Sequence, residues 1–248
     1  MTSFKDHFSS HASGYAAYRP TYPQALIAFL ADVAPRTELA IDCGCGTGQL
    51  SVPLASRFSR VVAIDASASQ IAAAHPHERV TYSVGTAEHT GASLHSADIL
   101  TVAQAAHWFA LDGFYEEVRR VVRPGGVVAL ITYGILHVEE DIRPLTQNFF
   151  VNVIGPYWPP ERAHVDSGYA LLPFPFAELK PPELSLEASW TLAEFIGYID
   201  TWSAVREAEK SAGRQPIIDF ADALARTWGA ADRRRVIRWP LSMRVGRV

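Results

Sequence analysis

"AIDCGCGTGQL", residues 40–50, is the stretch that decides the fold, because it places three glycines within five positions directly after an apolar run. Glycine loses more conformational freedom on folding than any other residue and offers no side chain for packing. A strand that runs into such a turn and then into a helix places backbone N–H groups and the positive helix end beside a docked ligand. The pattern therefore predicts a ligand-binding loop between a strand and a helix.

The segments around this loop alternate between two periodicities. Short apolar runs predict strands over 38–43, 60–65, 80–85, 97–104 and 127–133. Helical spacing of apolar residues predicts helices over 23–34, 48–58, 67–75 and 112–122. This alternation predicts an α/β fold, with a parallel sheet and helices on both of its faces.

The pattern changes after Tyr133. Prolines and aromatic residues crowd residues 135–184 without a regular period, which indicates an insertion over the sheet. Regular structure returns with a strand over 184–190, helices over 191–209 and 216–228, and a strand over 234–247. Thr191, with Glu194 three residues later, predicts a capping box at the first of these helices.

Composition excludes several classes of protein. The chain has 248 residues, of which 48% are hydrophobic, enough for one sizeable core. A net charge of −4 lacks the positive field that phosphate backbones need, so we expect no nucleic-acid partner. Arg233, Arg234, Arg235 and Arg238 stand beside apolar residues, which indicates the solvated flank of a strand. Without a secretion signal or a run of about 20 apolar residues, we expect a cytoplasmic protein with no membrane partner.

The two cysteines, Cys43 and Cys45, lie in the glycine-rich segment. Two residues apart in an extended-to-turn stretch, they are poorly placed to form a disulfide with each other. No second pair of Cys or His residues follows at metal-ligand spacing, so we expect no metal site. We interpret both as small filling residues.

The glycine spacing separates two kinds of nucleotide site. A dinucleotide fingerprint has the form G-x-G-x-x-G, whereas Gly44, Gly46 and Gly48 follow one another at single-residue spacing behind Asp42. No Lys-Ser/Thr pair follows the glycines, which excludes a triphosphate-binding loop of the Walker kind. A nicotinamide-dependent oxidoreductase is thus disfavoured, although it remains the alternative enzyme class.

"IDCGCGTG" at 41–48 resembles motif I of class I S-adenosylmethionine-dependent methyltransferases. Later segments are similar to further motifs of these enzymes in the same order: "GTAEHT" at 85–90, "VAQAAHWF" at 102–109 and "VVRPGG" at 121–126. The likeness to the methyltransferase type 11 group, with its trans-aconitate and cantharidin-resistance types, continues through "YAAYRPTYP" at 15–23, "IGPYWPPERAHVD" at 154–166, "LPFPF" at 172–176 and "WTLAEFIGYIDTWSAV" at 190–205. The resemblance covers nearly the whole chain.

The resemblance implies a Rossmann-like fold with a seven-stranded, mostly parallel sheet that contains one antiparallel strand. It implies a single domain, in which residues 1–134 form the cofactor-binding half, 135–184 a substrate cap, and 185–248 the strands and helices that complete the sheet. The implied cofactor is S-adenosylmethionine. The implied reaction is methyl transfer to a small organic molecule, with oxygen as the expected target atom.

Cofactor-binding residues follow from the same resemblance. Asp65, at the end of the second strand, is expected to bind the ribose hydroxyls, since a carboxylate accepts two hydrogen bonds from a diol. Asp42 is expected to organise the loop and the methionine amino group, and Arg19 to pair with the cofactor carboxylate. The full implied set is Tyr18, Arg19, Asp42, Gly44, Cys45, Gly46, Gly48, Asp65, Ala66, Ala87, Glu88 and Gln104.

The acceptor side is expected to use residues after the fourth strand and in the insertion. Gln104 and His107 are the candidate catalytic residues. The candidate substrate-binding residues are Trp108, Tyr157, Trp158 and Arg162. A carboxylate acceptor is already ionised at neutral pH, whereas a phenol, amine or alcohol gains from a base, for which His107 is the first candidate. A protein that binds the cofactor without turnover remains a third alternative, and the acceptor's identity and the oligomeric state stay open.

Overall fold

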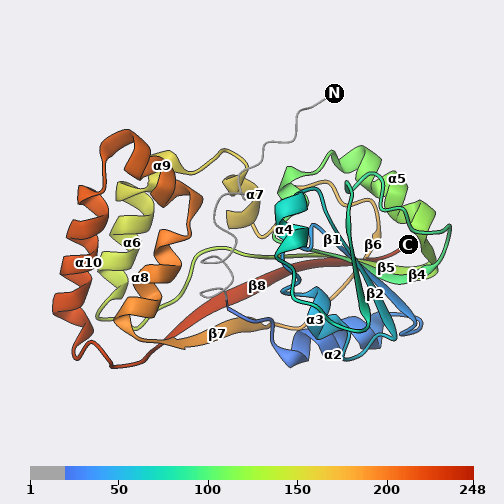
Figure 1. Cartoon of the computed structure of the whole chain (residues 1–248), viewed down its shortest axis with the longest axis horizontal. Helices are drawn as coiled ribbons and strands as arrows, with labels where there is room; N and C mark the ends of the chain where they lie inside the picture. Colours follow the sequence, from blue (N-terminus) through green and yellow to red (C-terminus); the bar gives the residue numbers. More distant parts are fainter. Residues whose placement is uncertain (1–19) are drawn as a thin grey trace.

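The computed structural model describes residues 20–248 and shows one mixed sheet with helices on both faces (Figure 1). The strands are β1 (Leu39–Cys43), β2 (Arg60–Asp65), β3 (Val80–Val84), β4 (Ala97–Ala103), β5 (Val122–Tyr133), β6 (Ala177–Leu179), β7 (Ser185–Trp190) and β8 (Arg235–Arg247). Their order is β3-β2-β1-β4-β5-β8-β6, and β7 pairs with β8 outside this path. Strands β1 to β5 pair in parallel, whereas β8 runs antiparallel to β5, β6 and β7. The predicted fold class is confirmed, and the short β6 is a strand that the sequence did not predict.

Both faces of the sheet are covered because successive strand residues point to opposite sides. Helices α2 (Gln24–Val33) and α3 (Ser51–Leu54) bury Leu26 and Leu54 in the same cluster as Ala40 of β1. Helix α5 (Leu111–Val121) buries Phe114 on the opposite face, with Ile41 of β1. The glycine-rich loop therefore starts from a strand that is buried on both sides.

Two predicted helices are shorter than expected. Over 48–58 only α3 is regular helix, and the chain continues to Phe58 through separate turns. Over 67–75 the helix is α4 (Ala68–Ala72), capped by the Ser67 side chain.

The predicted helix over 191–209 is two helices, α8 (Leu192–Asp200) and α9 (Ser203–Ala212). Trp202 lies between them in an extended conformation, with φ −70° and ψ 137°. The Thr201 hydroxyl donates to the Tyr198 carbonyl oxygen at 2.6 Å, which satisfies a carbonyl at the end of α8. The capping box of Thr191 and Glu194 is present as predicted.

A second group of helices lies at the far end of β7 and β8, and we call it the helical lobe (Figure 1). It contains α6 (Arg143–Asn148), α8, α9 and α10 (Gln215–Trp228), and Phe149 stacks on Phe220 with ring centroids 4.0 Å apart. Within residues 185–248, β7 and β8 extend the sheet, whereas α10 packs with α6, α8 and α9 in the helical lobe. From the region 135–184, α7 (Arg162–Asp166) instead packs near the end of β5.

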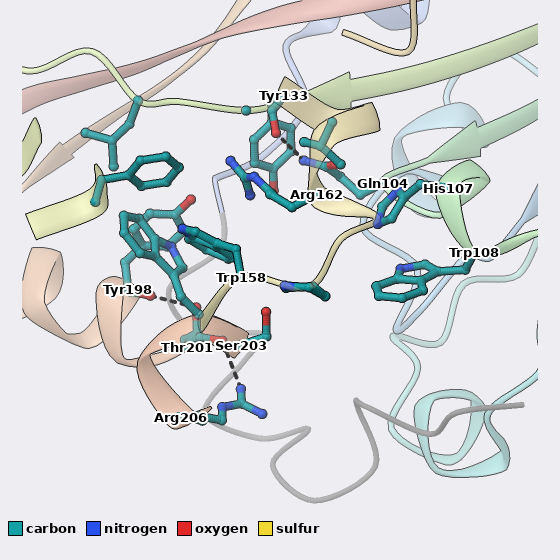
Figure 2. Close-up of a pocket in the computed structure, with 16 residues that line it drawn as sticks. Gln104, His107, Trp108, Tyr133, Trp158, Arg162, Tyr198, Thr201, Ser203 and Arg206 are labelled. Atoms are coloured by element: carbon teal, nitrogen blue, oxygen red, sulfur yellow. Dashed lines mark hydrogen bonds between the residues drawn. The ribbon is translucent and has the colours of Figure 1, made fainter. Parts of the chain in front are cut away.

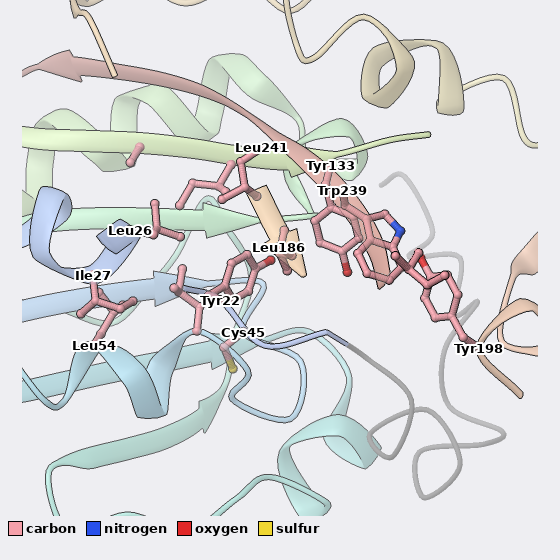
Figure 3. Close-up of a cluster of buried hydrophobic side chains, with 14 of the residues drawn as sticks. Tyr22, Leu26, Ile27, Cys45, Leu54, Tyr133, Leu186, Tyr198, Trp239 and Leu241 are labelled. Atoms are coloured by element: carbon pink, nitrogen blue, oxygen red, sulfur yellow. The ribbon is translucent and has the colours of Figure 1, made fainter. Parts of the chain in front are cut away.

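One hydrophobic cluster connects the two parts of the molecule (Figure 3). It runs from Leu26 on α2 past Tyr133 at the end of β5 to Trp239 on β8 and Tyr198 on α8. Burial alternates along the first half of β8, so that Ile237 and Trp239 are buried while Val236 is exposed. A shared core of this kind ties the helical lobe to the sheet.

The same alternation corrects one expectation about the arginine run. Arg235 is not solvated: it is 1% exposed, donates to Asp141 at 2.7 Å and lies over the Trp228 ring at 5.3 Å. Its register on β8 matches that of Ile237, so the strand turns it inward. The neighbouring arginines Arg233, Arg234 and Arg238 remain exposed, each with an acidic partner.

Candidate active site

The three glycines of the loop after β1 all have left-handed backbone conformations, with φ of +70° at Gly44, +56° at Gly46 and +95° at Gly48. A Cβ at Gly44 would lie 2.5 Å from the Cβ of Ala105, and one at Gly48 would lie 2.2 Å from the Tyr82 Oη. Both the backbone conformation and the close approach therefore require glycine at Gly44 and Gly48. The loop leaves bare main chain at the carboxyl end of β1.

Asp65 ends β2, and its carboxylate faces this loop. Its Oδ2 accepts a hydrogen bond from the Gly46 N–H at 2.9 Å, and its Oδ1 accepts one from the Ser67 N–H at 2.8 Å. Ala66, the next residue, is half-buried. The acid and the glycines, which are separate in the sequence, are thus brought together at one edge of the sheet.

Asp42 is buried beneath the loop and bonds to two hydroxyl groups. Its Oδ2 accepts from the Ser51 Oγ at 2.6 Å, and its Oδ1 accepts from the Thr101 Oγ1 at 3.0 Å. These bonds join the end of β1 to α3 and β4. Burial raises the pKa of Asp42 to about 6, and the two hydroxyl donors oppose that rise.

We expect Asp42 to make the protein less stable as the pH rises. The pKa is about 6 in the folded chain against 3.8 in a free side chain, so the folded state holds this proton more tightly. Stability from this group is greatest below pH 4 and falls until the pH passes 6, by an amount on the order of 3 kcal/mol. Asp42→Asn should remove this part of the pH dependence, as measured by urea unfolding between pH 4 and pH 8. An unchanged difference between pH 4.5 and pH 7.5 in the variant would contradict the assignment.

The remaining expected cofactor-binding residues lie in separate parts of the structure. Cys45 is buried, and burial raises the pKa of its thiol, so it stays a neutral thiol that fills space. Ala87 is buried on the α5 side of the sheet. Glu88 accepts a hydrogen bond from the Ala110 N–H at 3.3 Å, just before α5. Tyr18 and Arg19 lie outside the described residues.

Gln104 follows β4 and has a strained backbone, with φ of +59°. Its Nε2 donates to the Tyr133 carbonyl oxygen at 2.8 Å, and its Oε1 accepts from the Thr132 Oγ1 at 2.8 Å. A left-handed conformation in a residue other than glycine costs about 1–3 kcal/mol and is often found at functional sites. Both ends of the amide are held by β5, so the side chain is fixed at the carboxyl ends of the two strands.

A cavity of about 130 Å³ opens between these strand ends and the helical lobe (Figure 2). It brings together five of the predicted residues, namely Gln104, His107, Trp108, Trp158 and Arg162. Tyr157 does not line it and packs against the core instead. The sequence did not identify several other lining residues: Phe150, Tyr198, Thr201, Trp202, Ser203 and Arg206.

The charged groups that line the cavity are guanidinium groups. Arg162 is paired with Asp166 at 2.8 Å and lies over the Trp158 ring at 4.5 Å. Arg206 donates to the Thr201 carbonyl oxygen at 3.0 Å and has no carboxylate partner among residues 20–248. No Asp or Glu of the described chain lines the cavity. The buried Trp158 Nε1 has no acceptor among these residues, so the cavity favours a ligand with negative charge and hydrogen-bond acceptors.

His107 stands in the short helical turn η1 (Ala106–Trp108) and points its Nδ1 at the Tyr169 Oη, 3.0 Å away. Burial lowers the pKa of His107 to about 3, with smaller contributions from the charges of Arg162 and His164. The imidazole is therefore neutral at pH 7, which makes it a weak proton acceptor.

Two further site classes can be described for residues 20–248. Nowhere in this range do three or more His, Cys, Asp or Glu residues gather in a way that could hold a metal ion. Within the same range, each helix is too short or too polar to cross a membrane.

Comparisons with known proteins show which family the chain resembles. A family model described as a methyltransferase domain matches residues 41–130. A Dictyostelium discoideum protein with a provisional methyltransferase name is 32% identical over 235 residues, covering 93% of this chain and 89% of its own. The solved structure of a provisionally named type II methyltransferase from Anaeromyxobacter dehalogenans is 46% identical, with a TM-score of 0.89 and coverage of 93% of this chain and 98% of that chain.

A malonyl-[acyl-carrier protein] O-methyltransferase from Dechloromonas aromatica matches a smaller part, at 38% identity over 108 residues, or 42% of this chain and 39% of its own. The match to the Dictyostelium protein spans nearly both full chains, and the family model covers the glycine loop and the end of β4. The chain therefore belongs to the methyltransferases that use S-adenosylmethionine as their cofactor.

Proposed function

We propose that this protein transfers a methyl group to an oxygen of a small organic acid held in the cavity between the strand ends and the helical lobe. The observation that carries this proposal is the charge of the lining, where Arg206 has no carboxylate partner among the described residues and the Asp166 that pairs with Arg162 is not a lining residue. A guanidinium group binds a carboxylate through parallel N–H donors. An acceptor of this kind is ionised at pH 7 and needs no base.

The residues of the loop fit an adenosyl cofactor. Gly44 and Gly48 give this loop a main chain without side chains of its own, and the Asp65 carboxylate that binds the Gly46 N–H suits a ribose diol. When bound, the cofactor supplies an activated methyl group on a sulfonium centre. Gln104 would then stand between the cofactor and the acceptor, with its amide held in place by Thr132 and Tyr133. Tyr18, Arg19, Ala87 and Glu88 remain predicted cofactor contacts.

The cavity limits the size of the acceptor. Its volume is about 130 Å³. A cavity of about 150 Å³ in another protein holds one benzene molecule, so an acid with a single ring or a short chain is the expected size. Phe150, Trp158 and Trp202 are in mutual ring contact and supply an apolar wall for such a group. The name of the Dechloromonas relative, an O-methyltransferase, supports oxygen as the target atom.

The experiment measures release of S-adenosylhomocysteine with matched acceptors. We expect product with benzoate, phenylacetate or succinate and none with the corresponding amides, because the amides carry no charge for the guanidinium groups. Asp65→Asn should weaken cofactor binding about tenfold in isothermal titration, since one carboxylate acceptor becomes a donor. Product from phenols but not from acids would overturn the proposed acceptor.

Two alternatives predict different results. A binding protein without turnover gives no product with any acceptor although it binds the cofactor. An oxidoreductase binds NADH tightly and leaves S-adenosylmethionine unbound. Either result would overturn the proposed function.

A further inference from the structure

Tyr169 is a buried residue outside the predicted site, and it ends the segment that carries Arg162. It is 0% exposed and has a left-handed backbone, with φ of +66°, directly after Gly168 with φ of +62°. A Cβ at Gly168 would lie 2.6 Å from the Ser242 Oγ, so the turn is pressed against β8. The Tyr169 N–H donates to the His164 carbonyl oxygen at 2.8 Å. This turn fixes both the end of α7 and the place of the phenol.

The phenol oxygen of Tyr169 lies 3.0 Å from His107 Nδ1. The backbone N–H groups of Ala106 and His107 and the Thr132 hydroxyl also face it. The Thr132 hydroxyl donates its own proton to Gln104 Oε1. Because amide N–H groups can only donate to the phenol oxygen, we assign the phenol as the donor and the imidazole as the acceptor of the bond between Tyr169 and His107. Burial raises the pKa of Tyr169, so this proton is present at neutral pH.

The imidazole of His107 is neutral and therefore carries one N–H group. Burial is the main reason, and the charges of Arg162 on α7 and His164 on the same helix add to it. In a neutral imidazole one ring nitrogen donates and the other accepts. Because Nδ1 accepts from the phenol, Nε2 is the nitrogen that carries the hydrogen, and His107 lines the cavity.

We propose that Tyr169 is a positioning residue that holds His107 as the Nε2–H tautomer, so that His107 donates a hydrogen bond to the acceptor's oxygen and does not act as a base. The part that concerns the acceptor rests on the proposed function. A carboxylate that accepts the methyl group becomes a neutral ester: an O–C bond forms, the S–C bond breaks, and no proton is released. A fixed donor orients such an acceptor, whereas a base has nothing to remove.

This role makes His107 a specificity element. The Nε2–H group cannot remove the proton of a phenol or an alcohol, so it favours an acceptor that is already ionised, as a carboxylate is. His107 and Arg162 therefore both favour a negatively charged acceptor. The Tyr169 side chain positions His107, and the backbone turn at Tyr169 fixes the end of α7, the helix that carries Arg162.

The first test uses the wild-type protein with ¹⁵N-labelled histidine and no substrate. Long-range ¹⁵N–¹H NMR distinguishes the two tautomers, and we expect the Nε2–H form without titration between pH 5 and pH 8. An Nδ1–H form, or protonation near the ordinary histidine pKa of about 6.5, would overturn the proposal. Because no acceptor is present, this experiment tests the tautomer of His107 independently of whether the protein methylates acids.

The second test compares two tyrosine substitutions. Tyr169→Phe removes only the hydroxyl, and we expect a mixture of tautomers with a kcat/KM toward the acid that is about tenfold lower, at unchanged affinity for S-adenosylhomocysteine. The matched control is Tyr115→Phe, in which a buried phenol that donates to the Pro173 carbonyl oxygen at 2.6 Å is removed on the α5 side. The control should lose stability without changing the His107 tautomer. A Tyr169→Phe protein with wild-type tautomer and kinetics would contradict the proposed role.

Discussion

A Gly44→Ala variant is expected to lose cofactor affinity by at least about 100-fold and to be about 2–4 kcal/mol less stable than the wild type. The added Cβ would lie 2.5 Å from Ala105 Cβ, an atom attached directly to the main chain that cannot swing aside. The φ of +70° adds a second cost, because side chains disfavour left-handed backbone. Relief of both requires the loop to move away from the strand end. Titration with S-adenosylhomocysteine and urea unfolding measure the two effects.

Two further variants separate the causes. Gly125→Ala has the same kind of backbone, with φ of +77°, but nothing lies within 4 Å of its added Cβ. It should cost only about 1–2 kcal/mol and leave cofactor affinity unchanged. Adding Ala105→Gly to Gly44→Ala removes the closest contact but leaves the backbone strain and a 3.3 Å approach to the Phe109 ring, so only part of the affinity should return. Wild-type affinity in Gly44→Ala alone would show that the loop does not hold the cofactor.

Arg206→Gln is expected to lower kcat/KM for the acid acceptor by about 100-fold, mainly through KM, because a charge that pairs with substrate is lost. Arg206 stands on α9 across Trp158 from Arg162 (Figure 2). Arg162 already has Asp166 as a partner, whereas the described chain gives Arg206 none. Steady-state kinetics measure the change, with the concentrations of the acid and of the cofactor varied in separate series.

Arg226→Gln is the control, since it removes the same charge from an exposed position on α10 away from the cavity. It should leave kinetics unchanged. Affinity for S-adenosylhomocysteine should be unaffected in both variants. Equal kcat/KM for the acid in Arg206→Gln and wild type would remove Arg206 from the acceptor site.

The sheet was predictable from the sequence because its central strands are buried on both faces and appear as short apolar runs. Strands β1 and β2 start or end within one residue of the expected positions. The helical lobe was not predictable in the same way, since its assembly depends on contacts such as Phe149 with Phe220, which are far apart in the chain. Apolar helical spacing shows that a helix has a buried face and does not show what covers it.

The same distinction between local signals and long-range contacts applies to the residues of the candidate site. The loop glycines carry a local signal, whereas Arg206 was missed because a continuous helix over 191–209 left no break at Trp202 to direct α9 toward the cavity. Between the adjacent aromatic residues Tyr157 and Trp158, only the folded chain decides which one lines it. His107 was predicted from its place in a motif, but its neutral state comes from burial, and its hydrogen-bond partner Tyr169 is 62 residues away in the chain.

Strand β8 connects the helical lobe to the cofactor-binding sheet. Its first half, 235–240, pairs with β7, and its second half, 241–247, pairs with β5, so one continuous strand passes from the helical lobe into the cofactor-binding sheet. A hinge motion that closes the helical lobe over the sheet would have to bend β8 and break its hydrogen bonds to β5 or β7. We therefore expect the cavity to keep its shape when the acceptor binds, so that the size and shape of the acceptor decide which molecules enter.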